Sequence, residues 1–583
     1  MNGGAVIART LNGHGVRNLF TLIGGHISPI LTEAKKSGIR VVDFRQEADA
    51  VFAADAVGRL TGSPGVAVVT AGPGLANGVT ALMNAKMAQS ALVVIAGAAT
   101  TVLRGRGALQ DIDQPSLVRH AVKAVFSITK SCDLVHTLDS AFVLAQSGVP
   151  GPVLVECPID LVYDEQLVRK WYLDKGPGSG AFMDRMVSWY LRRHVDRIFA
   201  CDPQGMSDRI ADTMERGRIA PDVPGLDDRG VARATALIVR SERPAMVLGS
   251  QAVLDPGKLD ALIQSVNAIG VPVYLAGMAR GLLGTAHPLQ FHHRRNSTLA
   301  EADLVVLAGM PCDFRLDYGR AINPKAEVIS INRSKRDLIL NRRPRLAVNA
   351  DPAAFLIACS SSLAGGRERK AWIQTLRMRE QQREDQIRGL AGQGTAYINP
   401  LRLLERIDST LADKSIIVAD GGDFVATASY IVQPRGPLSW LDPGVFGTLG
   451  VGAGFAIGAK LCRPTSDVWL LWGDGAAGFS IIEFDTMVRH RIPVIAVIGN
   501  DAGWTQIARE QVELLGDDVA TALRYSNYHQ VAQAFDAKAF VVSSEDEIEP
   551  VLRQAVEVSR KGTPVLVNAL IGRTEFRKGS ISM

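Results

Sequence analysis

Two glycine-flanked aspartates near the C-terminus have the types and spacing needed to hold a divalent cation and a diphosphate. One apolar run leads into Gly473-Asp474-Gly475-Ala476, and the next leads into Gly499-Asn500-Asp501-Ala502-Gly503. Glycines leave backbone N–H groups uncrowded, so that they can bind a diphosphate at the start of the following helix. A carboxylate beside them is a good ligand for a hard divalent cation.

The spacing of the two aspartates adds to this signal. Asp501 follows Asp474 by 27 residues, which leaves room for one helix and one strand. We therefore expect the two carboxylates at neighbouring strand ends, the edge at which ligands bind in an open α/β sheet. A single Gly-Asp-Gly is a weak signal because tight turns use the same residues. The pair at this spacing is much more specific.

Other residues of chemical interest lie in the first hundred positions. Glu47 follows the apolar run 41–44 and opens a helix, a place that also suits an acid because of the helix dipole. Gly72 and Pro73 belong to the turn Thr70-Ala-Gly-Pro-Gly. This turn does not match the dinucleotide pattern GxGxxG, since the next glycine comes one position late. A nicotinamide enzyme is therefore disfavoured.

The segments that carry these residues share one pattern, in which short apolar, β-branched runs alternate with helical stretches and Gly/Pro turns. This pattern indicates parallel βαβ units. We therefore predict an α/β fold with three doubly wound parallel-sheet domains. The expected strands are 41–44, 65–70, 91–97 and 152–157, then 244–250, 271–277, 303–309 and 327–332, and finally 415–422, 467–475 and 492–501.

Changes in composition predict where the domains end. The boundaries give a first domain at 1–164, a helical insertion at 165–225, a central domain at 226–365, a helical connector at 366–395 and a third domain at 396–583. The glycine-rich segment 175–180 marks the break into the insertion. The connector is highly charged and lacks proline, which is typical of a solvated helix.

Composition excludes several classes of protein. A length of 583 residues suggests roughly four units of about 150. Hydrophobic residues make up 47% and charged residues 21%, which excludes a disordered or fibrous chain. The 64 basic and 59 acidic residues leave a net charge of only +5, so no polyanion-binding class is indicated. A small positive excess can still favour a phosphorylated small molecule.

Cysteine usage and hydropathy bear on the cellular location. The six cysteines include no CxxC pair, which argues against a disulfide framework or a zinc knuckle. The N-terminal residues do not resemble a secretory signal. The most apolar runs are about nine residues long, whereas a membrane-spanning helix needs about 20. We expect a soluble, cytoplasmic protein that binds neither nucleic acid nor membrane.

The stretch from Ile457-Gly458 through Gly473-Asp474-Gly475-Ala476 resembles the thiamine-diphosphate signature of the acetolactate synthase and 2-keto-acid decarboxylase superfamily. In that family Mg²⁺ is held by the aspartate of this motif, by a second residue that is usually Asn, and by a carbonyl two positions later. The resemblance implies Mg²⁺ ligands at Asp474, Asp501 and the carbonyl of Gly503. Asp501 departs from the usual Asn and adds one negative charge, but a carboxylate remains a good ligand for Mg²⁺.

The resemblance also implies residues that bind thiamine diphosphate. Glu47 would face the aminopyrimidine ring and promote its imino tautomer, which makes it a catalytic residue. The carbonyl of Gly447 would accept from the exocyclic amine, and Leu449 would wedge the two rings together. The turn that contains Gly72 and Pro73 would border the cofactor across a dimer interface. The remaining implied cofactor-binding residues are Gly422, Asp423, Phe424, Gly473, Gly475, Ala476 and Trp504.

The runs that resemble this superfamily extend nearly end to end and are most similar to its 2-hydroxyacyl-CoA lyases of the second type. Such enzymes cleave a 2-hydroxyacyl-CoA to formyl-CoA and an aldehyde, or run in reverse. Two other reactions stay open, those of an acetolactate synthase-like carboligase acting on pyruvate and of an oxalyl-CoA decarboxylase-like enzyme. A non-catalytic family member is a further alternative, against which the joint presence of Glu47, Asp474 and Asp501 argues.

Substrate residues follow from the same resemblance. Gln110 would lie near the reacting carbon, next to Leu109, where relatives carry Phe or Tyr. His26, which follows Gly25, could move a proton as a neutral imidazole, although a lone loop histidine is often only polar filler. Gln506 would form a pocket wall. The cations expected near the CoA phosphates are Arg280, Arg315, Arg573 and Arg577.

The resemblance bears finally on further ligands and on assembly. The central domain would take ADP, CoA or FAD, which the sequence does not separate. In this superfamily the residues that correspond to Glu47 and Asp474 come from different chains. The resemblance therefore implies a homodimer at minimum and a homotetramer as a dimer of dimers.

Overall fold

The structure is a computed structural model that describes residues 1–173, 182–201, 203–217, 221–363 and 368–578. The glycine-rich segment 175–180 and the predicted boundary at 365–366 lie outside these residues. The chain divides into two compact units. The first comprises residues 1–58 and 63–222, and the second comprises residues 59–62 and 223–583.

The first unit contains a six-stranded sheet with the strand order β2-β1-β3-β4-β6-β5. Adjacent strands pair in parallel. The chain order reverses between β1 and β3, and in such a sheet ligands bind at the carboxyl ends of the strands beside this switch point. The strands are β1 (Asn18–Thr21), β2 (Arg40–Asp43), β3 (Gly65–Val69), β4 (Leu92–Ala98), β5 (Ala124–Ser127) and β6 (Pro152–Pro158).

The C-terminal sheet repeats this topology with the order β13-β12-β14-β15-β17-β16, and its strand pairs are also parallel. Its switch point therefore lies between β12 and β14. Every residue of β14 and β15 is buried, as expected for strands covered on both faces. The strands are β12 (Ile416–Asp420), β13 (Trp440–Leu441), β14 (Val468–Gly473), β15 (Ile495–Asn500), β16 (Lys538–Val542) and β17 (Val565–Leu570).

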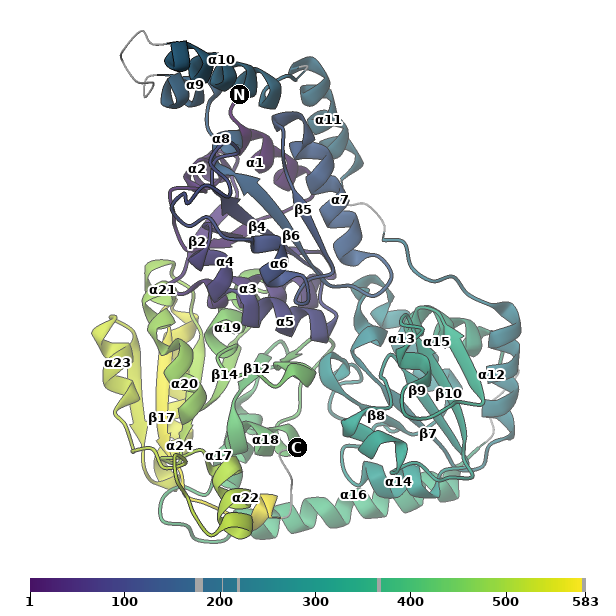
Figure 1. Cartoon of the computed structure of the whole chain (residues 1–583). Helices are drawn as coiled ribbons and strands as arrows, with labels where there is room; N and C mark the ends of the chain where they lie inside the picture. Colours follow the sequence, from purple (N-terminus) through teal and green to yellow (C-terminus); the bar gives the residue numbers. More distant parts are fainter. Residues whose placement is uncertain (174–181, 202, 218–220, 364–367, 579–583) are drawn as a thin grey trace. The chain divides into compact units, whose positions relative to one another are not determined.

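The central sheet has five strands in the order β11-β10-β9-β7-β8, again paired in parallel. The predicted α/β fold with three parallel sheets is thereby confirmed. Figure 1 shows the central sheet with helices on both sides, and the C-terminal sheet follows it in the same unit. The strands are β7 (Pro244–Leu248), β8 (Val273–Leu275), β9 (Leu304–Ala308), β10 (Glu327–Asn332) and β11 (Leu346–Asn349).

Helices connect the strands throughout the described residues. Those before residue 165 are α1 (Gly3–Gly13), α2 (Ser28–Lys36), α3 (Glu47–Thr61), α4 (Pro73–Asn77), α5 (Val79–Ala88), α6 (Gln114–Val118), α7 (Leu134–Gln146) and α8 (Ile159–Val162). Those of the predicted insertion are α9 (Glu165–Leu173), α10 (Phe182–Ile198) and α11 (Pro203–Arg216). Those around the central sheet are α12 (Asp228–Arg240), α13 (Leu259–Ile269), α14 (Arg295–Glu301) and α15 (Pro352–Ser361).

The predicted connector forms the long helix α16 (Lys370–Ala391), but it is not simply a solvated helix. Its buried side chains include Trp372, Leu376 and Glu380, and Trp372 belongs to the core under the central sheet. The helices that follow are α17 (Pro400–Thr410), α18 (Gly422–Ile431), α19 (Gly452–Cys462), α20 (Asp474–Ser480), α21 (Phe484–Arg489), α22 (Thr505–Leu515), α23 (Tyr528–Ala534) and α24 (Glu545–Arg560).

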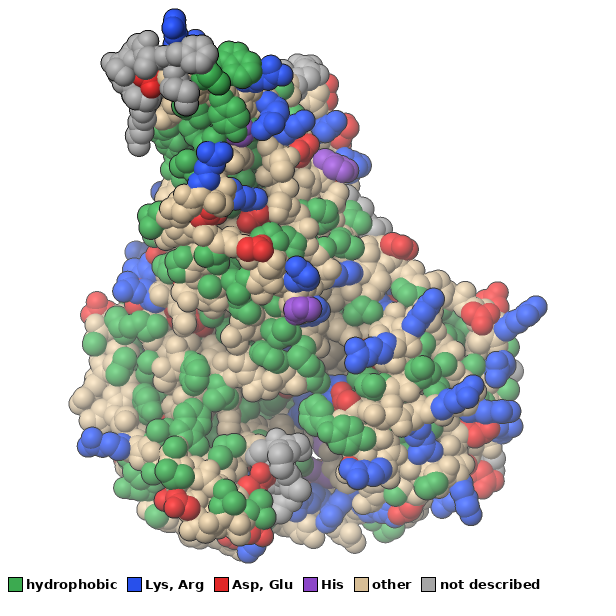
Figure 2. Space-filling model, viewed as in Figure 1, with side chains coloured by type: hydrophobic (Ala, Val, Ile, Leu, Met, Phe, Trp, Pro, Cys, Tyr) green, Lys and Arg blue, Asp and Glu red, His purple; other side chains and the backbone are tan. Residues whose placement is uncertain are grey.

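The surface of the folded chain carries charges of both signs, as its small net charge suggests. On the face shown in Figure 2, Lys and Arg side chains are interspersed with Asp and Glu. Among the described residues, no helix combines the length and the apolar character needed to cross a membrane.

Candidate active site

A cleft lies at the carboxyl ends of β12, β14 and β15, beside the switch point of the C-terminal sheet, and encloses about 300 Å³. It brings together residues that lie up to 85 positions apart in the sequence. The predicted residues that line it are Gly422, Asp423, Phe424, Gly447, Leu449, Gly473, Asp474, Gly475, Ala476, Asp501, Gly503, Trp504 and Gln506. The C-terminal part of the predicted site thus forms one cavity.

Asp474 and Asp501 form a pair of largely buried carboxyl groups in this cleft. The backbone N–H of Gly475 donates to Oδ1 of Asp474 at 2.8 Å, and that of Gly503 donates to Oδ2 at 3.2 Å. Burial raises the pKa of Asp474, and the adjacent charge of Asp501 raises it further. Burial also raises the pKa of Asp501. Two carboxylates that oppose each other's ionisation are stabilised by a cation placed between them.

Glycine is required at two positions of the cleft because aromatic rings pack directly on the backbone. A Cβ on Gly475 would lie 2.4 Å from the ring of Trp504, and one on Gly499 would lie 2.4 Å from the ring of Phe424. The two rings therefore form walls that only glycine admits. The glycines that the sequence marks as a diphosphate cradle also allow this close packing.

The residues present fit a Mg²⁺ ion and the diphosphate of thiamine diphosphate. Carboxylate oxygens are the ligands that Mg²⁺ prefers. In addition, the hydroxyl of Thr505 in the cleft wall interacts with Asp501 and acts to lower the pKa of that carboxyl group, against the effect of burial. This contact favours the ionised form of Asp501, which is the form that binds a cation. Asp474, Asp501 and Gly503 are the residues that would hold the metal.

The structure gives Asp423 a partner, and Arg573 a position, that the sequence does not predict. Asp423 lines the cleft, but its carboxylate is paired with Arg509 on α22 at 2.7 Å. The Nη2 atom of Arg573 would lie 3.2 Å from a Cβ on Gly503, so its guanidinium adjoins the predicted metal loop. The charge of Arg573 acts to lower the pKa of Asp501, against the effect of burial.

Glu47 lies at the carboxyl edge of the N-terminal sheet, at the start of α3. Its side chain is buried, and its Oε2 accepts a hydrogen bond of 3.0 Å from Nδ2 of Asn77. A Cβ on Gly74 would lie 3.5 Å from Oε1, so the turn that contains Gly72 and Pro73 passes beside the carboxyl group. The N-terminal part of the predicted site is therefore also assembled at a sheet edge, within the first unit.

His26 and Gln110 lie close to the same turn. Nδ1 of His26 is 3.3 Å from Oγ1 of Thr70, and burial lowers the pKa of His26, which favours the neutral imidazole. Gln110 has a φ of +61°, a strained conformation for a residue with a side chain. A Cβ on Gly72 would lie 2.8 Å from the carbonyl oxygen of Gln110. By contrast, the side chain of Leu109 is 84% exposed, and Gly25 is also exposed.

Comparisons with known proteins agree with this geometry. The thiamine pyrophosphate enzyme N-terminal TPP binding domain matches residues 1–117, the central domain matches residues 231–359 and the C-terminal TPP binding domain matches residues 420–569. The chain belongs to the thiamine pyrophosphate enzyme family. Both sheet edges described above lie within the two TPP binding domains, so the predicted family and its cofactor, thiamine diphosphate, are confirmed.

Individual members of the thiamine pyrophosphate enzyme family resemble the chain over its whole length. The protein named 2-hydroxyacyl-CoA lyase 2 from Bos taurus is 50% identical over 100% of this chain and 92% of its own. Its namesake from Homo sapiens is 49% identical with the same coverage. The acetolactate synthase large subunit IlvG from Mycobacterium tuberculosis is 32% identical over 98% of this chain and 96% of its own.

The central part of this thiamine pyrophosphate enzyme contains a second cavity, of about 410 Å³, between the loops after β8 and the C-terminal end of α18. Of the cations predicted for CoA, Arg280 lines it. Arg315 is engaged by Asp313 through an ion pair of 2.7 Å. Arg577 lies over the ring of Tyr430, a residue of the cavity wall, and 3.9 Å from Asp423.

Several residues in or beside these cavities are not predicted from the sequence. Asp420 is the last residue of β12 and precedes the glycines of the cleft, and this place at the end of an apolar strand is a usable signal. Arg509 carries no local signal, because only the fold brings α22 to α18. The same holds for His293, Arg294 and Arg295, which line the second cavity and which the sequence shows only as a short polar run.

Proposed function

We propose that this protein is a thiamine-diphosphate- and Mg²⁺-dependent 2-hydroxyacyl-CoA lyase, a carbon–carbon lyase that cleaves a 2-hydroxyacyl-CoA to formyl-CoA and an aldehyde or runs the reverse condensation. The observation that carries the proposal is the likeness to proteins named 2-hydroxyacyl-CoA lyase 2, which reaches 50% identity over 100% of this chain. The named acetolactate synthase relative reaches 32%. The cleft with Asp474 and Asp501 supports the cofactor requirement.

The cofactor, when bound, supplies the carbanion stabilisation that cleavage beside a carbonyl needs. Asp474, Asp501 and the carbonyl of Gly503 would hold Mg²⁺ at the diphosphate. Gly447 and Leu449 would support the rings. These residues bind and orient, and they leave proton transfer to groups of the first unit.

Glu47 is the proposed acid toward the aminopyrimidine. Because Asn77 donates to Oε2, the proton of the neutral carboxyl group belongs on Oε1. Oε1 is therefore the atom from which Glu47 donates. Gln110 is the proposed donor to the substrate oxygen, and its strained backbone supports a functional constraint at this residue. His26, kept neutral by burial, is a second group for moving a proton.

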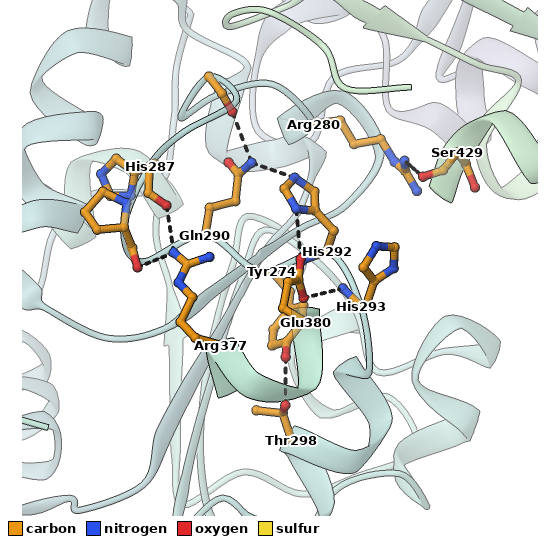
Figure 3. Close-up of polar contacts among 12 residues, drawn as sticks. Tyr274, Arg280, His287, Gln290, His292, His293, Thr298, Arg377, Glu380 and Ser429 are labelled. Carbon is orange, nitrogen blue, oxygen red and sulfur yellow. Dashed lines mark hydrogen bonds and ion pairs between the residues drawn. The ribbon is translucent and has the colours of Figure 1, made fainter. Parts of the chain in front are cut away.

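The cavity in the central part is the proposed site for the nucleotide end of CoA, and ADP or FAD would compete for it. Figure 3 shows Arg280 reaching Ser429 on α18, while Glu380 of α16 holds the segment that bears His292 and His293. The backbone N–H groups of these two histidines donate to Glu380 at 2.8 and 3.0 Å. Burial acts to raise the pKa of Glu380, but these hydrogen bonds outweigh it and the pKa is lowered.

The charged side chains that line this cavity are cationic. Arg280, Arg294 and Arg295 line it, and burial together with the neighbouring Arg280 and Arg315 lowers the pKa of Arg295. Nε of Arg295 and Nδ1 of His293 are buried without hydrogen-bond partners. Crowded cations and unpaired buried nitrogens favour an anion with several oxygens, such as a diphosphate. The same crowding disfavours a divalent cation on His293 and Glu380.

The distance between the two cavities suits an acyl-CoA. Helix α18 lines the cleft with its first residues and the second cavity with its last, and its 10 residues rise about 15 Å at about 1.5 Å per residue. The pantetheine arm of CoA, when extended, has a comparable length. A ligand whose phosphates lie in the second cavity could therefore present its thioester near the cleft.

A direct assay tests the proposed reaction. The purified enzyme with thiamine diphosphate and Mg²⁺ is offered formyl-CoA and an aldehyde, and in a parallel reaction pyruvate alone. We expect 2-hydroxyacyl-CoA in the first reaction and no acetolactate in the second. Acetolactate without 2-hydroxyacyl-CoA would instead establish the synthase alternative, and oxalyl-CoA offered as a third substrate tests the decarboxylase alternative. Product in none of these reactions would favour a non-catalytic family member.

The proposed CoA site has its own test. In Arg294→Ala and Arg295→Ala we expect the KM for the acyl-CoA to rise about tenfold, with kcat changed much less, because each guanidinium binds a remote part of the substrate. Arg320→Ala is the matched control, since Arg320 is also in the central part but is exposed and paired with Asp317. An unchanged KM in both variants would show that the CoA phosphates do not bind in this cavity.

We also propose a homodimer at minimum and a homotetramer as the assembly, together with a cytoplasmic location. The resemblance to the superfamily implies that Glu47 and Asp474 of one active site come from different chains. Light scattering after size-exclusion chromatography measures the mass directly. An active monomer would contradict the proposed assembly, and enrichment of the protein in a membrane fraction would contradict the proposed location.

A further inference from the structure

Asp420, the last residue of β12, is a fully buried carboxyl group that no basic side chain pairs with in the described chain. It accepts three hydrogen bonds. The backbone N–H of Gly450 donates to Oδ1 at 3.2 Å, while the backbone N–H of Gly452 and Nε1 of Trp472 donate to Oδ2 at 2.9 and 3.1 Å. A charge-bearing group is costly to bury, so this arrangement calls for a reason beyond packing.

The donors identify what Asp420 holds in place. Gly450 ends the segment Gly447–Gly450, of which Gly447 and Leu449 line the cofactor cleft. Gly452 is the first residue of α19, whose N-cap is Val451, a residue without a capping side chain. Asp420 therefore supplies from a neighbouring strand the acceptor that the helix start lacks. One carboxylate fastens the segment to β12 and to the N-terminus of α19.

The position of Leu449 depends on this fastening. Leu449 lies one residue before Gly450, and its Cδ2 is 3.7 Å from the place of a Cβ on Gly421, which follows Asp420 in the chain. Gly450 has a φ of +89°, so the backbone turns sharply at the bonded residue. A shift of Gly450 away from Asp420 would move Leu449 relative to the cleft floor.

We propose that Asp420 is a positioning residue that holds Leu449 in the cleft and thereby sets the affinity of the site for the ring system of thiamine diphosphate, but not for its Mg²⁺-diphosphate end. This inference rests on the proposed use of the cleft for that cofactor. Asp474 and Asp501, which would bind the metal, follow β14 and β15 and are not among the donors to Asp420.

Asp420→Asn is a near-isosteric test. Oxygen at the Oδ2 position keeps the bonds from Gly452 and Trp472, but the amide nitrogen then faces the N–H of Gly450, and two donors cannot bond to each other. The variant therefore releases Gly450 selectively. Asp351→Asn is the control, because Asp351 is also buried and also caps a helix, α15, by accepting from the backbone of Ala354 at 2.9 Å. It differs from Asp420 in that it also forms a buried ion pair with Arg333.

The first measurement uses the protein without cofactor. Amide hydrogen exchange should become about tenfold faster in the peptide that spans 447–452 of Asp420→Asn, since the loss of one buried hydrogen bond corresponds to about that factor. The control variant should leave this peptide unchanged. Unchanged exchange in Asp420→Asn would overturn the proposal, and it would do so whatever the reaction of the enzyme is.

The second measurement compares two probes in the presence of saturating Mg²⁺. Intrinsic tryptophan fluorescence, to which Trp504 of the cleft contributes, reports binding of thiamine diphosphate or of inorganic pyrophosphate. We expect Asp420→Asn to weaken thiamine diphosphate about tenfold and pyrophosphate less than about twofold. Equal weakening of both probes, or of neither, would overturn the proposal. If the unaltered protein binds neither probe, the proposed function fails instead, while the exchange result still stands.

Trp472→Phe provides a second variant in case Asp420→Asn does not fold. It removes one donor and leaves the carboxylate bonded to Gly450 and Gly452. We expect the exchange of the 447–452 peptide to stay slow and the affinity for thiamine diphosphate to stay within about twofold. Fast exchange in this variant would show that Trp472, and not Asp420, fastens the segment.

Discussion

Arg509 on α22 donates hydrogen bonds of 2.8 and 2.7 Å to the two carboxylate oxygens of Asp423 on α18. Each side chain is 15% exposed, so the pair is shielded from most of the solvent. Asp423 forms part of the cleft wall. The guanidinium therefore neutralises a carboxylate that would otherwise repel the diphosphate proposed for the cleft.

Arg509→Ala is expected to weaken thiamine diphosphate binding about tenfold, because the carboxylate of Asp423, left with only the more distant Arg577 at 3.9 Å, then opposes the diphosphate. Fluorescence titration with the cofactor at constant Mg²⁺ measures the effect. The double variant Arg509→Ala with Asp423→Ala should recover most of the affinity, since it removes both charges. If the double variant binds as weakly as Arg509→Ala alone, Arg509 itself contacts the cofactor.

The metal site should bind Mg²⁺ more weakly at acidic pH. Burial and the mutual repulsion of the pair raise the pKa of Asp474 to about 7, and burial raises that of Asp501. Below pH 7 the free site therefore holds protons that Mg²⁺ must displace, so the apparent Kd should rise by up to about tenfold per pH unit for each proton. Calorimetric titration over a series of pH values measures this slope.

Asp501→Asn serves as the comparison for the pH dependence, because the amide keeps the size of the side chain and removes its charge. The neighbouring charge that raises the pKa of Asp474 is then absent. The weakening of Mg²⁺ binding should consequently begin at a lower pH than in the unaltered protein. An identical pH profile in both proteins would show that the two carboxyl groups do not titrate as a pair.

Glu47→Gln should abolish most of the turnover and leave cofactor binding nearly unchanged. Its side chain keeps the size of the original and can still accept from Asn77 but cannot transfer a proton, so we expect a loss of about 10²–10⁴-fold in kcat. Turnover and cofactor titration are measured on the same preparation. Glu33→Gln, on α2, is the control, because Glu33 is paired with the exposed Lys36 on its own helix. Full activity in Glu47→Gln would show that Glu47 is not a catalytic residue.

Gln110→Gly should make the protein more stable and less active. Glycine adopts the φ of +61° without strain, which should raise the free energy of unfolding by about 1 kcal/mol. Loss of the amide should lower kcat. Chemical denaturation and steady-state kinetics measure the two quantities. Gln110→Ala is the control, since it loses the amide but keeps the strain, and it should lower the activity without the gain in stability.

The sequence predicts strands best where they are buried on both faces and lead into a recognisable turn. Val468–Trp472 is continuously apolar and leads into Gly473-Asp474-Gly475, so that the strand and its functional end are recognised together. The strands β1, β5, β11, β13, β16 and β17 are not predicted, although nearly every residue of β17 is buried. Lys538–Val542, for example, alternates between buried and exposed residues at the edge of its sheet, which gives a weaker signal.

Within the site, the sequence indicates candidate residues that stand in short contiguous motifs, but not contacts between partners that are distant in the chain. Asp474 and Gly475 are adjacent and stand in one such motif. The partner of Asp423 lies 86 residues away on another helix, and nothing in either local sequence indicates the contact. The connector shows the same limit, because its charged composition conceals the buried Glu380 that holds the wall of the second cavity.

Helix α18 joins the two cavities, and this has a consequence for how the protein can vary. Each residue added to a helix turns its far end by about 100° and lengthens it by about 1.5 Å. An insertion between Gly422 and Ser429 would therefore rotate Ser429 and Tyr430 away from Arg280 while Gly422 stayed at the cleft. Surface loops elsewhere can gain or lose residues with little effect, but the number of residues in this helix cannot change without disturbing one of the two cavities.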